Sequence, residues 1–428
     1  MRPFSFACHK FSCESGRFID ARHARPHGLI VEGFDPETMN RAAAGNAGIV
    51  ARFAGSVADV SALPTSLRAV LDYYATTGEF PLDAVRLQRR VDAHVEDVIA
   101  NAFDDVERTI AEEAGVDADA VSFSYDTKLT MPAELTLGHV YQRARSNEST
   151  PVERAEDVTE LVVVALLDGD MRDAINDAEF EDFLVEGADA VGRERAAELA
   201  QAALRTQVEE LFDGFPEAVR DAYREAVDRS EAHQDRDPYF RELMADARDG
   251  DVDALEAIRR EYKHGGFGDS DNDRDDAGDD RDDADPIIRP AELFVDEERS
   301  FPYLKTQYGR VGVIYDGMVE MYRAAGIDVE DTFKRSIVFT IIGAQIWLDD
   351  IDDYEDDLVD TQLTPVTAEY LLADSDREAY RNVVDATNEY LRAAERYAAE
   401  TNSPLAGIGA NYVFYSGDPS VLPGYDGE

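Results

Sequence analysis

The sequence predicts an all-α protein, a helical bundle, because apolar residues recur at spacings of three and four along most of its length. A second observation agrees: no β-branched alternation lasts long enough to argue for a sheet, and Ala120–Tyr125 is the one passage expected as a strand or extended loop. Turn residues such as Gly214-Phe215-Pro216 separate the helical runs. The clearest expected helices are Leu82–Ala114, Arg193–Phe212, Tyr308–Ala325, Val329–Leu358 and Ser375–Thr401.

Composition allows a sizeable core and excludes two classes of partner. The chain has 428 residues, of which 44% are hydrophobic, and 92 acidic against 42 basic residues give a formal net charge of -50. This charge excludes nucleic acid and anionic membrane as general partners and is typical of a halophilic cytoplasm. Acidic residues are therefore common background, and any single carboxylate motif carries little weight.

The sequence offers no membrane span and no export signal. The longest apolar run, Ile337–Leu348, is 12 residues long and contains Gly343 and Gln345, well short of the roughly 20 residues that cross a bilayer. Cys8 and Cys13 are the two cysteines, and no leader with an apolar core precedes a cleavage site. We therefore expect a protein of the reducing cytoplasm, and a homodimer is compatible with the sequence.

Changes in composition divide the chain into four parts. We expect an N-terminal tail at 1–38, the first half of a helical bundle at 39–262, an acidic disordered linker at 263–290, and the second half of the bundle at 291–428. The tail holds Cys8, Cys13, His23 and His27, but the nine residues between Cys13 and His23 fall short of the usual zinc-finger spacer. The alternatives are a mobile tail or a translation start at Met39.

The stretch Ile337–Asp357, IVFTIIGAQIWLDDIDDYEDD, passes directly from an apolar run into a ladder of carboxylates. As one helix it would place Gln345, Asp349, Asp353 and Asp357 on one face, at successive single turns. Oxygen ligands at this spacing suit a hard divalent cation such as Mg²⁺, especially when a substrate phosphate completes its coordination shell. The sequence therefore predicts a metal site here.

A second junction of apolar residues and aspartates occurs upstream, in LVVVALLDGDMRDAIND, residues 161–177. Asp170, Asp173 and Asp177 share a helical face, although Gly169 interrupts its start. Two antiparallel helices that face each other across a bundle would bring the two acidic clusters within reach of shared metal ions. A pyrophosphate held there also needs cationic donors, for which Lys305, one of five lysines, and Arg310 are the candidates.

The order of these features resembles a known family. Lys305-Thr306, then Gly343-Ala344-Gln345, then Asp349-Asp350-Ile351-Asp352-Asp353 resembles the C-terminal half of trans-isoprenyl diphosphate synthases of the class I terpenoid synthase fold. In that family a KT pair precedes a phenylalanine-glutamine step and a DDxxD motif. Here Ala344 replaces the phenylalanine, Gln345 lies one residue further from the aspartates, and the upstream cluster is not a DDxxD motif.

The resemblance implies a Mg²⁺-dependent prenyltransferase that joins an allylic diphosphate to isopentenyl diphosphate. On this interpretation Lys305 and Gln345 are the catalytic candidates, and Lys305 and Arg310 bind the diphosphate. The metal ligands are Asp349, Asp350, Asp353, Asp357, Asp170, Asp173 and Asp177. Asp349, Asp353 and Asp357 also form the DxxxDxxxD pattern of head-to-head synthases, so the subfamily stays open. The alternatives are a catalytically silent relative and a non-enzymatic halophilic interaction module.

Overall fold

The computed structural model confirms the all-α class. It describes residues 63–78, 82–125, 130–147, 149–176, 178, 180, 183–188, 190–266 and 290–426. The predictions for residues 1–38, for Asp177 and for most of the acidic linker lie outside the described residues. Within them the strands are β1 (Ser122–Ser124) and β2 (Leu184–Glu186), an antiparallel ribbon in which Phe123 pairs with Val185. The passage expected to be extended thus contains β1.

Helices account for most of the described residues. The first half contains α3 (Thr65–Thr77), α4 (Leu82–Ala114), α5 (Met131–Ser146), α6 (Val152–Asn176), α7 (Arg193–Phe212), α8 (Glu217–Gln234), α9 (Asp237–Arg248), α10 (Val252–Ala257) and the π-helical η5 (Ile258–Lys263). The second half contains α11 (Pro290–Leu293), α12 (Leu304–Gln307), the π-helical η7 (Tyr308–Gly312), α13 (Val313–Ala324), α14 (Asp331–Ala344), the π-helical η8 (Gln345–Asp350), α15 (Tyr354–Asp360), α16 (Pro365–Leu372), α17 (Asp376–Glu400) and α18 (Pro404–Ser416). Short 3-10 turns occur at η2 (Ala118–Ala120), η6 (Glu298–Ser300) and η9 (Pro419–Val421). The helices expected at Leu82–Ala114 and Arg193–Phe212 are confirmed to the residue as α4 and α7.

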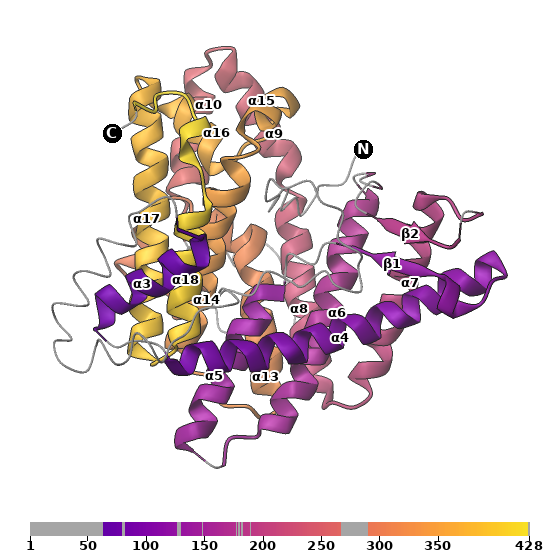
Figure 1. Ribbon diagram of the computed structural model, residues 1–428. Helices are drawn as coiled ribbons and strands as arrows, with labels where there is room; N and C mark the ends of the chain where they lie inside the picture. The colour runs from indigo at the N-terminus through magenta and orange to yellow at the C-terminus, as the bar shows by residue number, and fades with distance from the viewer. Residues whose placement is uncertain are drawn as a thin grey trace, which may run out of the picture.

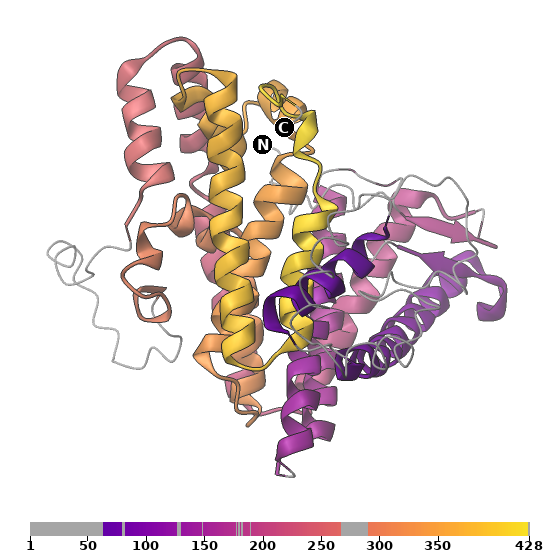
Figure 2. The same cartoon turned by 60° about the vertical axis from the view of Figure 1, so that its left-hand side comes forward.

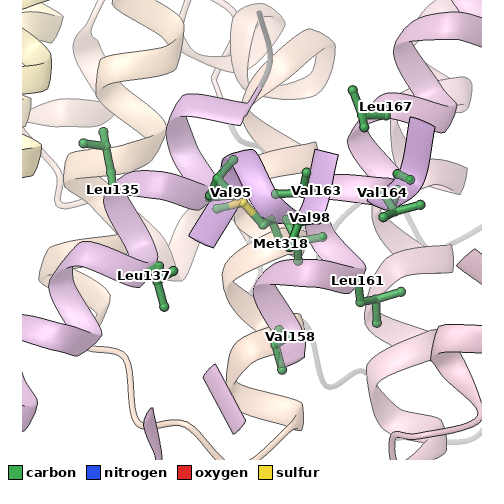
Figure 3. Close-up of a cluster of buried hydrophobic side chains, with 14 of the residues drawn as sticks. Val95, Val98, Leu135, Leu137, Val158, Leu161, Val163, Val164, Leu167 and Met318 are labelled. Carbon is green, nitrogen blue, oxygen red and sulfur yellow. The ribbon is translucent and has the colours of Figure 1, made fainter. Parts of the chain in front are cut away.

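The largest of the three clusters of buried hydrophobic residues among the described residues joins the two halves. Figures 1 and 2 show α14, α17 and α18 together on one side of the molecule and α6 and α7 on the other, and the halves meet where α13 packs against α6 and α18 against α4. One large cluster of buried side chains takes residues from α4, α5 and α6 and from α13 of the second half (Figure 3). Helices α8 and α13 approach closely, since a Cβ on Gly317 would lie 2.3 Å from the Cβ of Ala226. The labelled core residues are Val95, Val98, Leu135, Leu137, Val158, Leu161, Val163, Val164, Leu167 and Met318.

The stretch predicted as one helix, Ile337–Asp357, is not continuous. Helix α14 ends at Ala344, the π-helical η8 follows, and a turn at 351–353 separates it from α15. The prediction was wrong because an almost wholly apolar run has no period that could reveal a change from α to π geometry. The spacing of the aspartates nevertheless survives, since the N–H of Asp353 donates to the carbonyl of Asp349 at 2.9 Å and that of Asp357 to Asp353 at 2.8 Å.

Helices α6 and α14 run in the same direction, not antiparallel as expected. At the end of α5, Arg143 pairs with Asp328 in the α13–α14 turn at 2.8 Å, so α6 begins beside that turn. Thr159 near the start of α6 meets the hydroxyl of Tyr322 at the end of α13 at 2.7 Å. Helix α14 begins at the same turn, and both helices lead away from it (Figure 1). Because aspartates lie in the last turns of α6 and in the segment that follows α14, the parallel course directs both acidic segments toward the same end of the bundle.

Candidate functional site

Side chains from the three π-helical turns η5, η7 and η8 form a cluster of charged and polar groups. Tyr262 comes from η5, Arg310 from η7, and Asp349 and Asp350 from η8. The phenol of Tyr262 interacts electrostatically with both Arg310 and Asp350. Turns η5 and η8 both pack against α16, while η7 packs against α14. π-Helical turns are rare and frequently mark functional sites, so their convergence on one cluster identifies this region as the candidate site.

The π geometry of η8 explains how one glutamine reaches two aspartates. The Gln345 amide nitrogen donates to Oδ2 of Asp349 and lies 3.4 Å from Oδ1 of Asp350. In an α-helix, residues i and i+5 point about 140° apart, so Asp350 would face away from Gln345. A π turn aligns residue i with residue i+5 and brings both carboxylates to the glutamine side. All three side chains are buried.

Arg310 supplies the positive charge of the cluster. Its Nη1 lies 3.3 Å from Oδ1 of Asp350, and the two side chains are 19% and 1% exposed. Burial lowers the pKa of Arg310, but Asp350, Tyr262 and Asp349 raise it by more, so the guanidinium stays charged. The other carboxylate oxygen of Asp350, Oδ2, is buried without a hydrogen-bond partner among the described residues. An unsatisfied buried carboxylate oxygen is rare and calls for a ligand, an ion or a water.

Burial raises the pKa values of the aspartates in the cluster, and for Asp349 and Asp357 the neighbouring carboxylates raise them further. Burial, followed by the charges of its neighbours, raises the pKa of Asp349 well above its ordinary value. Burial raises the pKa of Asp350 to about 6 against the opposing effect of Arg310. Burial and Asp350 raise the pKa of Asp357 to about 8, although a hydrogen bond with Thr364 lowers it. The cluster therefore favours the binding of a cation, which would relieve the repulsion among the carboxylates.

Sequence reasoning missed His233 and Asp237, at the junction of α8 and α9. Burial and Arg310 lower the pKa of His233 to about 4, so its imidazole is neutral. Burial raises the pKa of Asp237 to about 6, again against the effect of Arg310. A Cβ on Gly309 would lie 2.7 Å from Nδ1 of His233. Gly309, directly before Arg310, was the local signal in the sequence, because a larger residue there would collide with His233.

The two residues of the KT pair differ in role: Thr306 is a buried structural residue, whereas Lys305 is partly exposed. The buried Thr306 donates to the carbonyls of Tyr262 at 3.1 Å and Tyr303 at 3.0 Å, and thereby ties α12 to η5. Lys305 is half-buried and makes no hydrogen bond or ion pair with the residues that the structure describes. Its Cδ lies 3.4 Å from where a Cβ on Gly265 would be. Lys305 is therefore near the site without taking part in its hydrogen bonds.

The upstream aspartates lie on α6, which runs through Gly169 without a break. Asp173 is buried and Asp170 is half-buried. Their neighbour Asp168, also buried, accepts a hydrogen bond from Gln201 of α7 at 2.9 Å. Burial raises the pKa of Asp168, and the nearby Arg172 lowers it. Figure 1 shows α6 beside α4 and α7, whereas α15 lies at the top with α9, α10 and α16, so different helices surround each acidic end.

The carboxylate oxygens of the cluster are of the kind that Mg²⁺ prefers, but the described residues do not form a complete set of ligands. Among the residues that the structure describes, no three His, Cys, Asp or Glu side chains are arranged to hold a metal ion. Carboxylate oxygens are nonetheless the ligands that Mg²⁺ prefers, and it commonly binds through one or two of them with waters and substrate phosphates. The aspartates that would serve are Asp349, Asp353 and Asp357, with the missing ligands supplied by a phosphate.

No helix within the described parts of the chain is long and apolar enough to cross a membrane. Comparison with family models, with curated proteins and with solved structures finds no match for this chain.

Proposed function

We propose that this chain is a Mg²⁺-dependent protein of the isoprenoid synthase type, which binds an allylic diphosphate and condenses it with isopentenyl diphosphate. The observation that carries the proposal is the juxtaposition of Gln345, Asp349 and Asp350 with Arg310 on facing π turns. Carboxylates that attract a metal ion and a guanidinium that binds phosphate are what a metal-bridged diphosphate requires. The parallel course of α6 and α14 adds support, because it directs a second acidic helix end the same way.

Each residue has a definite task in this proposal. Arg310 contacts Asp350 through one nitrogen, which leaves further N–H donors for a diphosphate oxygen. Lys305 is open to do the same. Asp349, Asp353 and Asp357 would hold Mg²⁺, which when bound neutralises charge on the diphosphate. The bond between the allylic carbon and the diphosphate oxygen breaks and its electron pair leaves with diphosphate. The isopentenyl double bond then attacks the allylic carbon, and a proton passes to a diphosphate oxygen.

The test is the release of diphosphate in molar salt. We expect the protein to release it from an allylic diphosphate, isopentenyl diphosphate and Mg²⁺, and we expect Asp349→Ala to abolish the release. Asp356→Ala is the matched control, because Asp356 is an exposed aspartate on the neighbouring α15. Equal activity of the two variants would refute the assignment of Asp349.

A second candidate is a non-enzymatic helical protein, in which Arg310 only neutralises the aspartates. The ion pair between Arg310 and Asp350 favours it, as does the lack of a preformed group of three ligands among the described residues. Under this proposal Mg²⁺ with pyrophosphate leaves the melting temperature unchanged and no substrate releases diphosphate. A rise in melting temperature with the two added together would favour the synthase proposal, since a ligand that binds only the folded state stabilises it.

A further inference from the structure

The position of Arg310 distinguishes this cluster from an ordinary group of metal-binding carboxylates. Its guanidinium contacts Oδ1 of Asp350 and is electrostatically coupled to Asp349 and Asp357 as well. Arginine stays charged under all ordinary conditions and is weakly hydrated, so it tolerates burial better than lysine does. A cation that is part of the chain thus already occupies the side of the cluster on which Asp350 lies.

A second, independent observation concerns Asp350 itself. The residue is 1% exposed, and its Oδ2 has no hydrogen-bond partner among the described residues. Arg310 Nη1 and Gln345 Nε2 both donate to the other oxygen, Oδ1, at 3.3 and 3.4 Å. The described partners of this buried carboxylate thus lie at Oδ1, where Arg310 supplies the positive charge.

We propose that the Arg310 guanidinium takes the place of a divalent cation at Asp350 and keeps a metal ion away from this carboxylate. A divalent ion bound to Asp350 would lie close to the guanidinium and would be repelled by it. Arg310 therefore limits divalent binding to the opposite side of the cluster, near Asp353 and Asp357. This inference concerns the electrostatics of the cluster and holds whether or not the chain is an enzyme.

The proposal accounts for the lack of a preformed group of three ligands among the described residues. Gln345 and Arg310 hold Asp350 in an orientation that serves their own hydrogen bonds. If Arg310 is removed, Asp350 loses its cationic partner and keeps the 3.4 Å contact of Oδ1 with Gln345. The same site then has one more negative charge and one more potential ligand.

The test is Mg²⁺ affinity, measured by calorimetry at pH 9 in molar KCl, without any phosphate. We expect Arg310→Met and Arg310→Gln each to bind Mg²⁺ at least about tenfold tighter than the natural protein. At the dielectric constant of water and before screening by salt, the repulsion between a guanidinium and a divalent ion about 6 Å away corresponds to a change of that size. The burial of the pair keeps the screening by KCl small. Arg310→Lys keeps the charge and should bind like the natural protein. Arg259→Met, which breaks an exposed pair with Glu256, is the matched control for the loss of one arginine.

Equal affinities across the series would overturn the proposal, and so would the failure of every variant to bind Mg²⁺. Two substitutions of different polarity guard against a variant that does not fold, and far-ultraviolet circular dichroism confirms the helix content of each. The outcome is separable from that of the proposed function. A natural protein that releases diphosphate while its Arg310 variants bind Mg²⁺ no tighter refutes this inference alone. Tighter binding by the variants of an inactive protein refutes the synthase proposal alone.

Discussion

Lys334 provides the sharpest test of what holds the second half of the bundle together. It lies on α14 and is 0% exposed, and its Nζ is 2.5 Å from Oδ1 of Asp316 and 2.7 Å from Oε1 of Glu320 on α13. Lys334→Met keeps most of the aliphatic stem but leaves Asp316 buried, with the Tyr308 hydroxyl as its remaining described partner. Removing one partner of a buried ion pair costs about 3–5 kcal/mol. We therefore expect the free energy of unfolding to fall by that amount in urea denaturation.

Two further variants decide whether the charge is responsible. Asp316→Asn combined with Lys334→Met removes both charges, so the double variant should be more stable than Lys334→Met alone. Arg259→Met breaks a pair whose side chains are about half exposed, and it should cost less than about 1 kcal/mol. If Lys334→Met loses no more stability than Arg259→Met, the reasoning that a buried ion pair ties α13 to α14 is refuted.

Three more predictions concern Gln345, Asp357 and Glu330. Gln345→Leu removes the amide that donates to two buried carboxylates, so it should lower the free energy of unfolding by about 1–3 kcal/mol in urea; an unchanged value would contradict the donor role. Because burial raises the pKa of Asp357 to about 8, the unfolded chain releases its proton at lower pH, and stability falls as pH rises from about 4 to 8. Asp357→Asn should flatten that decline in a urea series across pH, whereas Asp356→Asn should leave it as it is. The hydrogen bond with His139 lowers the pKa of Glu330 to about 2, so its contribution is lost as pH falls from about 4.5 to 2. Glu330→Gln should reduce that loss by about 1 kcal/mol, since the side chain is 44% exposed, and an unaltered acid transition would contradict it.

The sequence predicts helices well where one face is apolar and the other polar. Such alternation runs through Leu82–Ala114 and Arg193–Phe212, and both helices have the expected ends. It is missing from Ile337–Leu348, which is buried over most of its surface. Periodicity there could locate a helix but could not show that it changes to π geometry at Gln345. The direction of α6 relative to α14 depends on tertiary contacts such as that of Arg143 with Asp328, which no local pattern encodes.

The sequence pointed to the aspartates and named Arg310 as a candidate cation, but it did not predict the contacts between them. The regular spacing of Gln345, Asp349, Asp353 and Asp357 pointed to the aspartate ladder, and the backbone hydrogen bonds preserve that spacing. The pairing of Arg310 with Asp350 joins segments 40 residues apart, and the burial that shifts the pKa values is a property of the folded chain. His233 and Asp237 reach the site from a junction without any local motif of its own. Their role depends on the packing of α8 against η7.

The π turns explain why these distant residues meet. A π turn holds more residues than an α turn, so it rotates one side chain inward that α geometry would direct elsewhere. In η8 the residue gained is Asp350, which in an α-helix would point about 140° away from Gln345. In η7 Arg310 is presented to Asp350, and in η5 Tyr262 faces the same charges. Burying like charges on such turns raises the free energy of the folded state, and a bundle that needed only stability would gain by replacing them with apolar residues. Packing alone therefore does not account for the arrangement, and a divalent cation near Asp353 and Asp357 would relieve the repulsion among the carboxylates.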